Sequence, residues 1–276
     1  MRRGLHKGRQ ARLLAAWLLL AGLCTLALWL GENLWALGRA ETATPNDCFA
    51  AQVGSFDDEA EEAMLLKIAC LTFDDGPSRN TQEILRILQQ YDAPATFFVT
   101  AQEGNLDYLP SLADAAAQGH QIALHSATHE YSKIYRSSSA FWLDIKALRQ
   151  TLAPYVPVEN IHWLRFPGGS TNTVSHRYGG KGIMKQLIAE AEEKEYEWID
   201  WNVCGEDATA KHPNAAQILR NIQRDAAGRD ICVVLLHDTK ATGETVKALP
   251  DILQWFQEQG YHFCTVEEMY EVRRGD

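Results

Sequence analysis

The chain has 276 residues, a formal net charge of -10 and a hydrophobic content of 46%. That length suits one large domain or two small ones, with enough apolar residues for a buried core. The acidic balance argues against nucleic acid as a partner, because a phosphate-binding surface needs a basic excess. We find no internal repeat and expect no disorder beyond a short linker.

The amino terminus has the pattern of a membrane anchor. Five Lys and Arg residues within 1–12 precede an uncharged run from Leu13 to Leu30. At 1.5 Å per residue that run is roughly 27 Å long as a helix, close to the minimum for crossing a bilayer. We predict a basic cytoplasmic tail at 1–12, a transmembrane anchor at 13–33 and a linker at 34–64.

The charge asymmetry across this anchor predicts which side of the membrane the rest of the chain occupies. Basic residues stay on the cytoplasmic side, so we expect a single-pass protein whose catalytic part is extracytoplasmic. A cleaved signal peptide is the alternative, because Gly38-Arg39-Ala40 resembles a cleavage site. Cleavage would give a secreted protein.

The six cysteines indicate neither a zinc–thiolate site nor an assignable disulfide. No C-x-x-C spacing occurs among them, and Cys24 lies in the predicted anchor. Cys70, Cys232 and Cys264 fall in apolar, strand-like runs, so we expect them in the core. A disulfide between neighbouring strands stays open.

From about residue 65 the sequence alternates between β and α patterns. Seven segments have strand character, several as continuous apolar runs typical of strands covered on both faces. They are Ile68–Phe73, Ala95–Val99, Gln121–Leu124, Trp163–Phe166, Trp198–Trp201, Ile231–Leu236 and Phe263–Thr265. The first predicted helix is capped by Ser78 or Asn80. The later ones cover about 106–118, 138–152, 183–194, 215–226 and 252–258.

This alternation predicts an α/β fold, with one domain at 65–276 shaped as a distorted (β/α) barrel of about seven strands. An open doubly wound sheet also fits the alternation. However, the chain has neither G-x-G-x-x-G nor G-x-x-x-x-G-K-[ST], and its candidate functional residues follow many strands rather than one. We therefore favour the barrel.

Polar residues with catalytic chemistry gather at the predicted carboxyl ends of strands. Asp74 and Asp75 end the first strand before Gly-Pro, and His125 and His129 follow the third. Two imidazoles four residues apart can bind one ion if the segment is helical or tightly turned. Three later strands end in Arg165, Asp200-Trp201 and Leu235-Leu236-His237. Such clustering at carboxyl ends is typical of a barrel active site.

These segments resemble the signature motifs of a known family. The ordered set is similar to that of the nodulation-type polysaccharide deacetylases, carbohydrate esterase family four, and the resemblance covers about residues 65–276. The five motifs are Thr72-Phe73-Asp74-Asp75-Gly76-Pro77, His125-Ser126-Ala127-Thr128-His129, Arg165-Phe166-Pro167-Gly168, Asp200-Trp201 and Leu235-Leu236-His237. The resemblance implies a distorted (β/α) barrel that hydrolyses N-acetyl groups of an N-acetylhexosamine polymer.

The resemblance also implies a divalent metal, usually Zn²⁺, with Co²⁺, Ni²⁺ or Mn²⁺ as alternatives. Its ligands would be Asp75, His125 and His129, three protein groups that leave positions open for water and the acetyl carbonyl. Both aspartates can reach one site only if the strand is already turning at Asp74.

The remaining motif residues receive their roles from the same resemblance. Asp74 would be the general base, oriented and kept ionised by Arg165. His237 would be the general acid, held by Asp200. The backbone N–H of Gly168 would complete the oxyanion hole, and Trp201 with Leu235 would line a pocket for the acetyl methyl.

Two departures from the family pattern concern the substrate. Relatives often have an aromatic residue where Gly168 stands, so an aromatic wall facing the sugar would be absent. The segment Asn202–Asp207 carries Cys204 and Glu206 where relatives usually have smaller or hydroxyl residues.

We expect a monomeric, membrane-tethered deacetylase acting on a glycan, most readily peptidoglycan because the tether confines it near the wall. An O-acetyl esterase of a xylan-like polymer is one alternative. A non-catalytic wall-binding protein of the same fold is another, although no expected acid, base or ligand position is missing.

Overall fold

The computed structural model describes residues 67–274. The predicted basic tail, anchor and linker, which together cover residues 1–64, all lie outside the described residues. Within 67–274, no helix is both long enough and apolar enough to cross a membrane.

The described chain forms one eight-stranded sheet in which every pairing is parallel. The path runs β5-β4-β3-β2-β1-β7-β6, and β8 pairs with β1. The strands are β1 (Ile68–Asp74), β2 (Ala95–Thr100), β3 (Gln121–Ser126), β4 (Trp163–Leu164), β5 (Glu197–Trp198), β6 (Val203–Cys204), β7 (Ile231–His237) and β8 (His262–Phe263). The terminal strands β5 and β6 do not pair with each other, so the barrel is open there.

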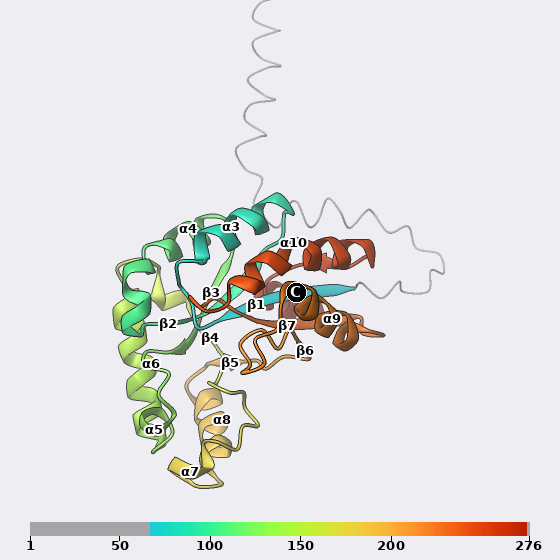
Figure 1. Ribbon diagram of the computed structural model, residues 1–276. Coiled ribbons are helices and arrows are strands. Elements are labelled where there is room, and N and C mark those ends of the chain that lie inside the picture. Colours follow the sequence, from blue (N-terminus) through green and yellow to red (C-terminus); the bar gives the residue numbers. More distant parts are fainter. Residues whose placement is uncertain (1–66, 275–276) are drawn as a thin grey trace, which may run out of the picture. The chain divides into compact units, whose positions relative to one another are not determined.

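Helices connect the strands and lie around them (Figure 1). The long ones are α3 (Thr81–Gln90), α4 (Ser111–Ala117), α6 (Ser138–Leu152), α8 (Ile183–Glu193), α9 (Ala215–Ala226), α10 (Gly243–Glu258) and α11 (Val266–Arg274). Short turns are η1 (Glu103–Tyr108), α5 (Tyr131–Ile134), η2 (Val158–Asn160) and α7 (His176–Gly179). Local sequence sets some ends: Asn214 and Gln217 form a capping box at α9.

The two faces of the sheet bury different residue sets because side chains alternate along each strand. The buried apolar side chains form two hydrophobic clusters. Leu71, Phe73 and Val234 belong to the larger one, which also contains most of the buried apolar side chains of the helices. The opposite face of the strands contributes Cys70, Phe98 and other residues to a smaller cluster. Thr72 and Asp74 continue this inner row, which becomes polar toward the carboxyl end of β1.

Three predicted elements differ most from the structure, while the predicted strands Trp163–Phe166 and Phe263–Thr265 correspond to the shorter strands β4 and β8. Helix α10 begins at Gly243 and runs through Pro250, whereas only 252–258 was predicted. Proline costs a helix interior about 3 kcal/mol, but buried residues on both sides of it, including Leu249 and Leu253, offset that cost. The predicted helix at 106–118 is divided into η1 and α4 around Pro110.

The third difference concerns the predicted strand Trp198–Trp201. It ends at Trp198, and the chain forms a further two-residue strand, β6, at Val203–Cys204. Such a short strand carries too few residues for a period of two to be recognised.

The prediction that Cys70, Cys232 and Cys264 are core residues is confirmed, and these cysteines are free thiols in the structure.

Candidate active site

The two adjacent carboxylates at the end of β1 are directed by a change of backbone conformation. Asp74 is the last strand residue, and Asp75 follows with φ of 69°, a left-handed conformation that aspartate tolerates better than most residues. The turn therefore begins at Asp75 rather than at Asp74 as predicted. The Asp75 carbonyl accepts hydrogen bonds from Thr100 Oγ1 at 3.0 Å and Asn105 Nδ2 at 2.9 Å, which hold this turn.

The two histidines are brought together by a tight turn at the end of β3. His125 belongs to the strand, whereas His129 has φ of 52°. The Asp144 carboxylate, from α6, accepts hydrogen bonds from Ser126 Oγ, Ala127 N, Thr128 N and Thr128 Oγ1 at 2.7–3.1 Å. This buried carboxylate fixes the turn, so of the two conformations that could bring the histidines together, helical or tightly turned, the structure has the tight turn.

Asp75, His125 and His129 offer ligand atoms that all lie within 4.8 Å of one another. The distances from Asp75 Oδ1 are 3.6 Å to His125 Nε2 and 3.4 Å to His129 Nε2. Asp75 Oδ1 is buried and has no hydrogen-bond partner among the described residues, which is costly unless another group satisfies it. The donor set of one carboxylate and two imidazoles is one that divalent transition metals prefer.

The tautomer of His125 also fits a metal ligand. Its Nδ1 lies 2.7 Å from the Arg165 carbonyl oxygen, so Nδ1 donates and the Nε2 lone pair faces Asp75. Burial lowers the pKa of His125 by more than the negative charge of Asp74 raises it. The neutral imidazole, which is the form that binds metal, is therefore favoured. The residues present therefore fit a divalent ion.

Arg165 holds Asp74 from inside the barrel. The guanidinium is fully buried, with Nη1 at 2.9 Å from Asp74 Oδ1 and 2.7 Å from Thr72 Oγ1. Its Nε and Nη2 donate to the carbonyls of Ile199 and Asp200, and its centre lies 4.1 Å from the Phe98 ring centroid. With one Asp74 oxygen bound in this way, Oδ2 faces the site, 3.8 Å from His125 Nε2.

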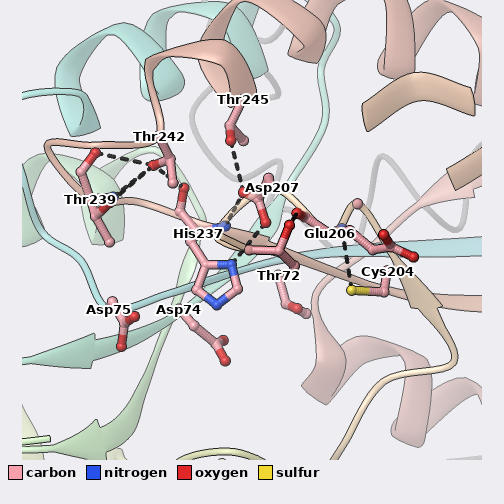
Figure 2. Close-up of polar contacts among 12 residues, drawn as sticks. Thr72, Asp74, Asp75, Cys204, Glu206, Asp207, His237, Thr239, Thr242 and Thr245 are labelled. Atoms are coloured by element: carbon pink, nitrogen blue, oxygen red, sulfur yellow. Dashed lines mark hydrogen bonds and ion pairs between the residues drawn. The ribbon is translucent and has the colours of Figure 1, made fainter. Parts of the chain in front are cut away.

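His237 is held by Asp207. In Figure 2 its ring lies between Asp207 and Asp74. Nδ1 is 2.9 Å from Asp207 Oδ1, the His237 backbone N–H donates to Asp207 Oδ2, and Thr245 Oγ1 donates to Oδ2 at 2.7 Å. Burial alone would lower the pKa of His237, but the hydrogen bond and charge of Asp207, with the charges of Asp74 and Asp75, raise it to about 9. The Nε2 atom is left to face the site.

The prediction that Asp200 holds His237 is therefore wrong. The Asp200 carboxylate instead accepts hydrogen bonds from Ser170 N at 2.8 Å and Ser170 Oγ at 2.5 Å. Ser170 follows Gly168 and Gly169, so Asp200 fixes the loop that carries the Gly168 amide. Asp200 follows β5, whereas Asp207 follows β6, so Asp200 lies against the Gly168 loop and not beside His237.

Gly168 is exposed and has φ of 78°. Its N–H has no hydrogen-bond partner among the described residues, so this donor is available to a substrate oxygen. Leu235 is buried on β7, two residues before His237 on the same face. The Trp201 ring centroid lies 5.7 Å from the Arg165 guanidinium carbon, and Trp201 also borders Gly169.

Two carboxylates with clear structural roles were not singled out from the sequence. Asp144 could have been recognised, because it is a carboxylate on the otherwise apolar buried face of α6, with Phe141, Ile145 and Leu148. Asp207 follows the very short strand β6, and little in the local sequence separates it from Glu206, which is paired with Arg224 instead.

Comparison with known proteins assigns a family. The polysaccharide deacetylase family profile matches residues 62–181. A peptidoglycan-N-acetylglucosamine deacetylase of Bacillus cereus is 32% identical over 209 residues, which are 73% of this chain and 70% of that protein. A bifunctional xylanase/deacetylase of Pseudobutyrivibrio xylanivorans is 30% identical over 75% of this chain but only 31% of its own length.

A solved structure shares both the fold and a substantial part of the sequence. It is the catalytic domain of a peptidoglycan N-acetylglucosamine deacetylase from Eubacterium rectale. The TM-score is 0.69 with 37% identity, covering 78% of this chain and 94% of that one. The match extends over nearly all of the solved domain.

Proposed function

The chain belongs to the polysaccharide deacetylase family and is a hydrolase acting on amide bonds, and we propose that it removes N-acetyl groups from peptidoglycan in a metal-dependent reaction. The observation that carries this proposal is one cluster of side chains at the carboxyl end of the sheet. A divalent-metal donor set lies there beside a carboxylate bound to arginine and an imidazole bound to a second carboxylate.

Asp75, His125 and His129 would hold the ion, which we propose to be Zn²⁺. When bound, it would polarise the acetyl carbonyl and make an attacking water more acidic. Co²⁺, Ni²⁺ and Mn²⁺ accept the same ligands and are the alternatives.

Asp74 acts as the general base in this proposal. Arg165 fixes one carboxylate oxygen at 2.9 Å and leaves the other facing the site. That free oxygen removes a proton from the attacking water. The Gly168 N–H donates a hydrogen bond to the carbonyl oxygen as negative charge develops on it.

His237 then acts as the general acid. An amine departs poorly until it is protonated, and a histidine whose pKa is raised to about 9 holds a proton at neutral pH. Asp207 binds Nδ1, which directs the Nε2 proton toward the departing sugar nitrogen. Leu235 and Trp201 would line the pocket for the acetyl methyl.

Peptidoglycan is the substrate we propose because several relatives bear that substrate in their names. A second candidate is removal of O-acetyl groups from xylan, which the similarity to a bifunctional xylanase/deacetylase favours. The two reactions differ in the leaving group, since an alkoxide leaves more readily than an amine and depends less on His237.

Substrate comparison tests the proposal. Acetate release by the full-length protein is measured on peptidoglycan, chitin oligomers and acetylated xylan, and we expect the highest kcat/KM on peptidoglycan. His237→Ala should lower N-acetyl release by about 10²–10⁴-fold and O-acetyl release by less. A preference for acetylated xylan with equal His237→Ala effects would support the esterase instead.

We propose further that the chain is monomeric and tethered with its catalytic part outside the membrane. The support for the tether and its orientation is the basic segment at 1–12 followed by the apolar run from Leu13 to Leu30. Protease accessibility from the outer side of intact cells, carbonate extraction of membranes and light scattering of the purified protein test these three points. Release into the medium would instead indicate a cleaved signal peptide.

A further inference from the structure

Tyr131 lies next to the proposed metal ligands. It is the first residue of α5, two residues after His129, and its ring meets the His129 ring edge to face, with centroids 5.6 Å apart. On its other side it contacts Tyr135, also at 5.6 Å, and the Tyr135 hydroxyl donates to the Pro167 carbonyl at 2.8 Å. Tyr131 is therefore packed between the histidine turn and the loop that contains Gly168.

The hydroxyl of Tyr131 occupies the space where a side chain at residue 168 would begin. A Cβ built on Gly168 would lie 2.6 Å from Tyr131 Oη and 3.3 Å from Tyr131 Cε1, which no side chain tolerates without a shift. Glycine at 168 therefore serves two purposes: it adopts a φ of 78°, and it admits the phenol end against the backbone.

The Tyr131 hydroxyl also has no hydrogen-bond acceptor among the described residues. The residue is half-buried, and Oη makes no hydrogen bond with any residue in 67–274, although Tyr135 beside it does. Ring packing against His129 and Tyr135 would be provided equally by phenylalanine. The hydroxyl therefore lacks a structural partner at a position between a proposed metal ligand and the free Gly168 N–H.

We propose that Tyr131 is a catalytic residue whose hydroxyl donates a second hydrogen bond to the acetyl oxygen of the substrate, beside the one from Gly168 N–H. This inference rests on the proposed function. A donor aimed at an oxygen that gains negative charge stabilises the transition state more than the bound substrate. Its effect belongs to the acyl half of the reaction, so it applies to amide and ester substrates alike.

Tyr131→Phe in the full-length, metal-loaded protein tests the proposal. We expect kcat to fall about 10- to 100-fold on both N-acetyl and O-acetyl substrates, with KM nearly unchanged, because donors of this kind contribute rate factors of that order or larger. Metal content and Tm should match the wild type, because the ring remains. Tyr155→Phe, in the connection from α6 to β4, removes a phenol hydroxyl away from the site and should leave kcat unchanged.

Acetate, the product, supplies a readout that does not require turnover. Its carboxylate places a negatively charged oxygen where charge develops in the transition state, so calorimetry should show about tenfold weaker acetate binding to Tyr131→Phe than to the wild type. Wild-type kcat with wild-type acetate affinity in Tyr131→Phe overturns the inference, as does a loss of activity accompanied by lost metal. An inactive wild type would contradict the proposed function, and acetate binding would still decide the role of Tyr131.

Discussion

Asp74 and His237 are register partners on the neighbouring parallel strands β1 and β7. The shared register places both side chains at the same level on the inner face of the sheet. Arg165 forms an ion pair with Asp74, and Asp207 binds His237 Nδ1 and raises the pKa of that imidazole. One pair of adjacent strands thus presents the proposed base beside the proposed acid, the first paired with a cation and the second with a carboxylate, which is the arrangement that acid–base catalysis needs.

Replacing Asp207 should move the alkaline limb of the pH–rate profile. The acid must be protonated, so activity falls as pH rises through the His237 pKa of about 9. Asp207→Asn removes the charge that raises this pKa, and the limb of kcat/KM should shift to lower pH by one unit or more. Asp200→Asn is the matched control, because Asp200 binds Ser170 and should leave the limb in place. A limb that moves only in Asp200→Asn would contradict the geometry.

Replacing the proposed ligands should separate metal binding from turnover. Asp75→Ala and His129→Ala each remove one of three donor atoms, so both should lose bound metal after dialysis. Asp74→Asn leaves the donor set intact and should retain metal while acetate release falls by at least 10²-fold. Metal analysis and acetate assay on the same samples give both values. Tight metal binding by both ligand variants would refute the assignment.

Removing Asp144 should loosen the histidine turn. Its carboxylate accepts four hydrogen bonds from residues 126–128, and Asp144→Ala leaves those buried donors without partners. We expect a loss of about 3 kcal/mol in the free energy of unfolding and weaker metal binding. Asp251→Asn, at an exposed position of α10, is the control for loss of a helix carboxylate. Denaturant unfolding measures the difference, and equal stability of the two variants would remove Asp144 from the account.

His120 should make the domain sensitive to acid. Its Nδ1 accepts a hydrogen bond from Ala95 N, and burial lowers its pKa to about 4. A group with a lowered folded-state pKa contributes stability above its unfolded pKa of about 6.5, and that stability is lost as pH falls toward about 4. His120→Asn keeps an acceptor for Ala95 N but cannot titrate. Its unfolding free energy should therefore vary less between pH 6.5 and pH 4, and an unchanged slope would argue against this role.

The sequence predicts most of this architecture because long apolar strands and the residues just after them are local features. The sequence alone could assign one site to Asp75, His125 and His129, because the carboxyl ends of parallel strands meet at one end of a sheet. The partner of His237 could not be predicted in this way. Asp200 and Asp207 both follow short strands, and only the register between β6 and β7 places Asp207 beside the imidazole.

Tertiary packing explains other differences between prediction and structure. Pro250 is normally a reason to end a helix, yet α10 continues through it because buried side chains on both sides of the proline, such as Leu249 and Leu253, anchor the helix. The contact between Tyr131 and Gly168 joins residues 37 positions apart in sequence, and no local pattern predicts it.

Acetate release from purified peptidoglycan, measured before and after removal of metal, tests the central claim most directly. The account predicts that the full-length protein releases acetate, that a chelator abolishes the release, and that added Zn²⁺ restores it in the wild type but not in Asp74→Asn. Release that continues at the same rate in the chelated wild type, or in Asp74→Asn, would contradict it.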